Sequence, residues 1–262
     1  MTNVWRFIDT GPCSAAYNMA LDEAIAIVVR KDNAPPTLRL YGWDMPSVSI
    51  GCFQKVSDVD IAYCIEKHIP VVRRPTGGRA ILHSNEITYS FSVKTTHRLF
   101  SKGLLDSYKK ISIALGYALS KIGLLSELKL IKENHRPRNP LCFHATSYGE
   151  ITINNKKIIG SAQKRWTDSL LQQGSIPFII DRDELVKVFR LKSTHGIREA
   201  FTGLKEILPE LNTDDLKNAI RTSFEETFNI RLIPLSPSQE EVSLAQEFEA
   251  KKYLSYQWNF RR

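Results

Sequence analysis

The residues best suited to chemistry lie in one short block, Val72 to His83, in which paired arginines precede paired glycines. Gly77 and Gly78 allow the backbone to turn with positive φ and to approach a bound molecule closely. Arg73 and Arg74 can bind a carboxylate or phosphate, or can lie along an acyl chain with their aliphatic stems. The block therefore predicts a substrate-binding loop.

A diglycine is also typical of an ordinary hairpin turn with solvated arginines beside it. The residues that follow favour a site. Glu86 to Val93 alternates as a strand does, so we expect the loop to lie between two strands of one sheet. Farther along come Cys142 and a second glycine-containing motif, Lys157 to Gln163. Several motifs that could serve one site are therefore present in the same chain.

Together these motifs resemble the lipoate-protein ligase A and octanoyltransferase family, which shares its fold with biotin protein ligase. The resemblance rests on the block from Arg73 to His83 and on Lys157 with Gly160, Ser161 and Ala162. It covers nearly the whole chain. The other family-like residues are Asn18, Met19, Ala20, Asp22, Glu23, Arg39, Tyr41, Gly42, Trp43, Gly51, Phe53, Gln54, Gln173, Gly174, Ser175, Lys252, Tyr253, Trp258 and Asn259.

The resemblance implies an α+β fold: a biotin/lipoate protein ligase-like catalytic domain with mixed and antiparallel sheets flanked by helices. No internal repeat divides the chain, so we expect a single catalytic domain over residues 1–262. It would have a sheet-rich core to about residue 180 and a helical C-terminal extension from about 181 to 262. Local patterns predict strands at 5–8, 37–41, 47–51, 86–93, 150–153, 157–162 and 170–180, and helices at 14–30, 58–67, 104–122, 183–189, 213–228 and 238–252.

Cys142 decides which reaction the resemblance implies. The cysteines at 13, 52, 64 and 142 lack the spacing of a zinc site or a disulfide framework, so we expect no metal site. From spacing alone, Cys142 could be a small buried residue or a nucleophile. Its position before the Lys157 motif matches the cysteine of the ligase-like octanoyltransferases. The resemblance therefore implies that Cys142 carries the acyl group as a thioester.

Lys157 is the second catalytic residue that the resemblance implies. In the family, the equivalent lysine reaches the reacting carbonyl, where an ammonium stabilises negative charge that develops on oxygen. Taken alone, Lys157 could also be a solvated hairpin lysine, as we expect of Lys156. By the same resemblance, the substrate-binding residues are Arg73, Arg74, Thr76, Gly77, Gly78, Arg79, His83, Gly160, Ser161 and Ala162.

The implied activity is octanoyl transfer from acyl carrier protein, through Cys142, to a lysine of lipoyl domains. The acceptors would be the glycine cleavage H protein and the acyltransferase subunits of 2-oxoacid dehydrogenases. Arg79 stands where ligases of the family commonly have a third glycine, which favours the transferase branch. This reaction needs no cofactor. The alternatives are an ATP-dependent lipoate ligase, which needs ATP and Mg, a lipoyl amidotransferase between lipoyl proteins, and a non-catalytic carrier-protein-binding module.

The charge balance bears on the choice of partner. The chain has 36 lysines and arginines against 28 aspartates and glutamates, a formal net charge of +8. The basic residues are spread along the chain and no nucleic-acid motif is present, so we expect attraction of acidic carrier proteins and no nucleic-acid partner. No apolar run approaches the roughly 20 residues that span a bilayer, and the first residues lack a signal-peptide pattern. We therefore expect a cytoplasmic protein without a membrane partner.

Overall fold

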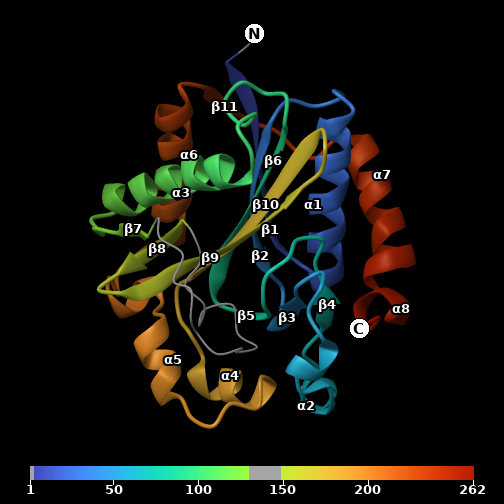
Figure 1. Cartoon of the computed structure of the whole chain (residues 1–262), viewed down its shortest axis with the longest axis vertical. Coiled ribbons are helices and arrows are strands. Elements are labelled where there is room, and N and C mark those ends of the chain that lie inside the picture. Colours follow the sequence, from blue (N-terminus) through green and yellow to red (C-terminus); the bar gives the residue numbers. More distant parts are fainter. Residues whose placement is uncertain (1–2, 130–148) are drawn as a thin grey trace.

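The computed structural model describes residues 3–129 and 149–262, so Cys142 lies outside the described residues. A mixed eight-stranded sheet runs through the centre of the molecule in the order β11-β1-β2-β6-β10-β9-β8-β7 (Figure 1). The strand β1 pairs in parallel with β2 and β11, and the remaining pairs are antiparallel. The strands are β1 (Val4–Cys13), β2 (Thr37–Trp43), β6 (Glu86–Lys94), β7 (Glu127–Lys129), β8 (Glu150–Ile153), β9 (Lys156–Arg165), β10 (Ser169–Pro177) and β11 (Arg231–Pro234).

A second, three-stranded sheet carries the arginine loop, which we define as residues 74–80. Its strands are β3 (Ser47–Ile50), β4 (Val71–Arg73) and β5 (Ile81–His83), in the order β4-β3-β5. The loop joins β4 to β5, whereas β6 belongs to the large sheet. The loop therefore lies between two strands of one sheet, as expected, but the following strand of that sheet is β5 and not the predicted strand at 86–93. The short strand β5 ends before the exposed residues Ser84 and Asn85, where the chain crosses from one sheet to the other.

Helices cover both faces of the large sheet. On one face α1 (Ala15–Arg30) lies beside α7 (Gln239–Phe248), and on the other α3 (Leu104–Lys121) lies beside α6 (Thr213–Phe228) (Figure 1). The small sheet shares a hydrophobic core with three short helices, α2 (Ile61–Glu66), α4 (Arg182–Val188) and α5 (His195–Ala200). Ser14 caps the start of α1, because its hydroxyl accepts from the Tyr17 N–H, and a capping box of Ser238 and Glu241 opens α7. Among the described residues, no helix is long and apolar enough to cross a membrane.

The C-terminal region is less uniformly helical than predicted. It contains β11, which adds to the edge of the large sheet in register with β1 from Val4 opposite Arg231 to Phe7 opposite Pro234. A four-residue strand is too short for its alternation to be recognised, and it forms because β1 offers it a pairing edge. Phe224 and Phe228 of α6 share a hydrophobic core with Trp5 and Phe91 of the large sheet. Beyond α7 the chain continues as a π-helical turn (Glu249–Tyr253) and α8 (Tyr256–Asn259).

Candidate active site

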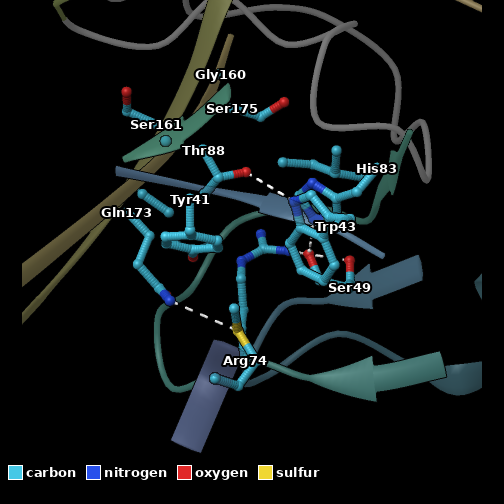
Figure 2. A pocket seen from close by; sticks show the side chains of 14 residues that line it. Tyr41, Trp43, Ser49, Arg74, His83, Thr88, Gly160, Ser161, Gln173 and Ser175 are labelled. Carbon is cyan, nitrogen blue, oxygen red and sulfur yellow. Dashed lines mark hydrogen bonds between the residues drawn. The ribbon is translucent and has the colours of Figure 1, made fainter. Parts of the chain in front are cut away.

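A small pocket lies between the two sheets. Figure 2 shows side chains from both sheets converging on it. The lining residues are Met19 of α1; Tyr41, Trp43, Thr88, Gly160, Ser161, Ala162, Gln173, Gly174 and Ser175 of the large sheet; and Ser49, Arg74, Ile81 and His83 of the small sheet and its loop.

The large sheet supplies one wall of the pocket through two adjacent strands. In the antiparallel register of β9 and β10, Gly160 lies opposite Ser175 and Ala162 lies opposite Gln173. Because the β9 residues at these positions have small side chains, they leave room above the sheet. Closer to its start, β9 contains one extra residue relative to β8, since Lys157 pairs with Thr152 while Ile159 pairs with Ile151. Such a bulge changes which side chains face the pocket.

Glycine is required at Gly78 in the arginine loop and at Gly51 in the segment that packs against it. Gly78 has φ of +86°, a conformation that disfavours other residues, whereas a Cβ atom at Gly77 would meet nothing within 4 Å. A Cβ atom at Gly51 would lie 1.9 Å from the Gly78 carbonyl oxygen. The loop is also bonded to its neighbour, because the Cys52 N–H donates to the Thr76 carbonyl over 2.8 Å. The loop and the segment after β3 therefore pack backbone against backbone.

Arg74 holds the arginine loop from inside. Its Nη1 donates to the Ser49 carbonyl and hydroxyl oxygens, each at 3.0 Å, and its Nη2 donates to the carbonyls of Gly77 at 2.8 Å and Arg79 at 2.7 Å. The guanidinium therefore braces the loop that contains it, while the side chain forms part of the pocket wall.

Thr76 ties the same loop to the large sheet. Its hydroxyl donates to Oε1 of Gln173 over 2.8 Å, and Nε2 of Gln173 donates to Asp22 over 2.7 Å. The fully buried Asp22 also accepts from Arg39, Tyr41 and Ser90. Burial, and then the Asp22 carboxylate, raise the pKa of Tyr41 well above its usual value. Tyr41 therefore stays protonated and its ring is fixed at the pocket.

His83 lies on the opposite side of the pocket in a continuous hydrogen-bonded chain. Its Nε2 is 2.7 Å from the Ser49 hydroxyl and its Nδ1 is 2.9 Å from the Glu86 carboxylate. Glu86 also accepts from Ser175 at 2.7 Å and from Thr88. The His83 ring stacks on Trp43, with centroids 3.9 Å apart and planes 12° apart (Figure 2). With both nitrogens bonded and one face covered, His83 contributes shape to the pocket.

Lys157 is buried, unlike a solvated hairpin lysine. Its side chain is 6% exposed, and its Nζ donates to Glu150 over 2.6 Å. The Lys157 carbonyl accepts from the Thr202 N–H, which joins β9 to the segment after α5. The adjacent Lys156 is half-buried. The two lysines thus occupy different environments, and Lys157 does not contribute to the pocket lining.

The structure brings together part of the predicted set. Arg74, His83, Gly160, Ser161 and Ala162 line the pocket. Thr76, Gly77, Gly78 and Arg79 lie in the arginine loop at its edge. Arg73 and Lys157 lie outside the lining. The predicted nucleophile Cys142 lies outside the described residues.

Several lining residues were missing from the predicted site. The strand β10 is buried along its whole length, yet it contains Gln173 and Ser175, and amides in a buried strand are a signal of function that could have been used. Trp43 and Met19 gave no such signal, because apolar residues are ordinary in a core. Only packing brings them to the pocket.

Comparison with known proteins shows the family of this chain. The lipoyl protein ligase A/B catalytic domain matches residues 14–225. The chain belongs to this family. Curated members include the octanoyltransferase LipM of Geobacillus kaustophilus, which is 35% identical over 274 residues and 99% of both chains. LipM of Carboxydothermus hydrogenoformans is 37% identical over 98% of both chains, and LipM of Bacillus subtilis is 33% identical over the same share.

Solved structures confirm the fold of this family member. A lipoate-protein ligase A bound with ATP has a TM-score of 0.82, 26% identity and 99% coverage of both chains. The putative lipoate protein ligase Ta0514 of Thermoplasma acidophilum, with bound lipoic acid, has a TM-score of 0.81 and 24% identity over both full chains. The predicted family and the predicted α+β ligase-like fold are therefore confirmed.

Proposed function

We propose that this protein is an octanoyltransferase that takes an octanoyl group from acyl carrier protein, holds it on Cys142, and passes it to a lysine of a lipoyl domain. The proposal rests mainly on the relation to LipM octanoyltransferases. Their sequence identity to this chain is 33% to 37% and extends over 98% or more of it. The pocket supports it. Its apolar walls of Met19, Tyr41, Trp43 and Ile81 suit a medium-length acyl chain.

The proposed transfer proceeds in two steps, and neither step requires energy from ATP. The Cys142 thiolate attacks the carrier thioester, the oxyanion that forms collapses, and the carrier sulfur leaves as a thiolate. The acceptor amine then attacks the Cys142 thioester, an amide forms, and the Cys142 thiol is released. The first exchange is nearly isoenergetic and the second is downhill, so neither step requires ATP. The ammonium of Lys157 would stabilise the oxyanion in both steps.

The other cysteines are poorer candidates for this role. Burial, followed by the charges of Asp60 and Glu184, raises the pKa of Cys64 to about 11, so this thiol is protonated at neutral pH. Cys52 is 6% exposed and its Sγ lies 3.1 Å from Nη2 of Arg261. Cys13 is half-buried at the end of β1. Among the described cysteines, none lines the pocket.

A labelling experiment tests the proposal. The purified protein, incubated with octanoyl-carrier protein without ATP, should gain one octanoyl mass on the peptide that contains Cys142. Cys142→Ala should abolish transfer to a lipoyl domain, by several orders of magnitude. Cys64→Ala is the matched control and should keep transfer. Label on Cys13, Cys52 or Cys64, or a requirement for ATP, would overturn the assignment, the latter in favour of the ligase alternative.

The partners follow from the same proposal. Lipoylation within the family implies lipoyl-domain acceptors, and the acyl carrier protein donor belongs to the transferase branch. A cytoplasmic location fits both partners. The reaction as proposed uses no cofactor, and ATP with Mg would enter only if free lipoate or octanoate were the acyl source.

A further inference from the structure

The helix α8, near the C-terminus, lies outside the region matched by the family and contacts Arg73, the residue just before the arginine loop. The family match ends at residue 225, whereas α8 covers Tyr256–Asn259. This short helix packs against β4, and the C-terminus lies beside it (Figure 1). Because β4 is an edge strand of the small sheet, its outer backbone groups need partners other than a strand.

Side chains of α8 supply those partners at a single residue, Arg73. The Arg73 N–H donates to Oδ1 of Asn259 over 2.8 Å, and the Arg73 carbonyl accepts from Nε1 of Trp258 over 2.8 Å. Nε of Arg73 also donates to the carbonyls of Trp258 and Asn259, each at 3.2 Å. These bonds join residues 185 and 186 positions apart in the sequence.

The same arginine holds the segment on which the loop packs. Its Nη1 donates to the carbonyls of Gly51 and Gln54, each at 2.8 Å, and Arg73 is fully buried. From the C-terminus, Nη2 of Arg261 donates to the Cys52 carbonyl at 3.1 Å. Gly51 is the residue whose backbone lies against Gly78. Arg73 therefore connects α8 to the arginine loop through two contacts, the chain itself and the 51–54 segment.

The helix α8 is itself fixed to the rest of the molecule. The Trp258 ring has Nζ of Lys252 4.1 Å and the Arg261 guanidinium carbon 4.0 Å from its centroid. Nδ2 of Asn259 donates to the Tyr253 carbonyl over 2.7 Å, and the Tyr253 hydroxyl donates to Glu23 of α1 over 2.7 Å. A series of hydrogen bonds thus runs from α1 through α8 to β4.

We propose that α8 positions the acyl pocket, with Asn259 as the positioning residue that fixes Arg73. Arg74, the next residue, forms part of the pocket wall, and Thr76, two residues farther along, bonds to Gln173. When Asn259 no longer holds the Arg73 backbone, this wall moves and the pocket loses its fit to an acyl chain. The proposal rests on the proposed function only for the identity of the ligand as an octanoyl group.

Binding of octanoic acid, measured by calorimetry, tests the proposal without turnover. Asn259→Ala should weaken binding by up to about tenfold, the factor that corresponds to one lost hydrogen bond. Asn259→Asp keeps the oxygen that accepts from the Arg73 N–H but loses the donor to the Tyr253 carbonyl, so it should bind octanoic acid more tightly than Asn259→Ala and less tightly than the unchanged protein. Tyr256→Ala is the matched control, because Tyr256 is on the same helix and 77% exposed, and it should bind as the unchanged protein does.

Amide hydrogen exchange provides a second measurement that needs no ligand. In Asn259→Ala, exchange should accelerate selectively at residues 73–80, and Tyr256→Ala should leave it unchanged. Acceleration spread over the whole chain, or unchanged octanoate affinity, would mean that α8 only stabilises the fold and would overturn the proposal. If the unchanged protein fails to bind free octanoate, the exchange measurement alone decides the positioning role, whereas the proposed function is decided separately by the octanoyl label on Cys142.

Discussion

At the scale of single residues, the two lysines at the start of β9 show how neighbours in sequence acquire different roles. Lys157 is buried against Glu150, whereas Lys156 is half-buried. An ammonium held in a site of low dielectric stabilises an oxyanion more strongly than one in water. The proposed role of Lys157 therefore depends on its burial as much as on its charge.

We expect Lys157→Ala to slow both acylation and deacylation by roughly 10²–10³-fold, the usual effect of losing one transition-state stabiliser. Lys156→Ala should be near neutral. Both half-reactions can be followed by the appearance and loss of the octanoyl mass. Since Lys157→Ala leaves the Glu150 carboxylate buried without its partner, the double variant with Glu150→Gln separates charge burial from catalysis. Recovery of activity in the double variant would contradict the role.

At the scale of elements, the arginine loop is built for close approach of its backbone to a neighbouring segment. The paired glycines looked equivalent in the sequence, but only Gly78 has positive φ. A Cβ atom at Gly78 would also lie 2.9 Å from Nη2 of Arg74, the group that braces the loop. The requirement for glycine therefore differs between the two positions.

We expect Gly78→Ala to destabilise the protein by about 1–2 kcal/mol, because a side chain in this conformation is strained, and to weaken octanoate binding. Gly77→Ala should change neither quantity, since a methyl group there meets open space. Chemical denaturation and calorimetry check the two effects. Equal losses at both positions would mean that the turn geometry differs from the one described.

At the scale of the whole molecule, the chain has a formal net charge of +8. If it recruits an acidic carrier protein, added salt should raise KM for octanoyl-carrier protein and leave kcat nearly unchanged. The reason is that the screening length is already about 8 Å at physiological salt and shortens further. A small octanoyl thioester is the control and should show no such dependence. If added salt raises KM equally for both donors, the charge acts on the active site or on the stability of the protein and not on docking of the carrier protein.

Local features of the chain were predictable because they depend on neighbouring residues. The cap at Ser14, the capping box before α7 and the hairpin at Asn154 and Asn155 each follow from a few adjacent side chains. The strand β11 and the division of the strands between two sheets were missed, because both depend on pairing between distant segments. One domain over residues 1–262 stays a prediction, supported by the core that Phe228 shares with Trp5.

The sequence by itself determined which motifs are present and, through them, the family, the ligase-like fold and the candidate nucleophile Cys142. Only the tertiary structure decided how the adjacent arginines divide their roles. Arg74 turns into the pocket, while Arg73 is bonded to residues 185 and 186 positions away. A sequence pattern reflects the conformational preferences of neighbouring residues. The contacts of Arg73 arise only when elements far apart in the sequence pack together and each buried donor needs an acceptor.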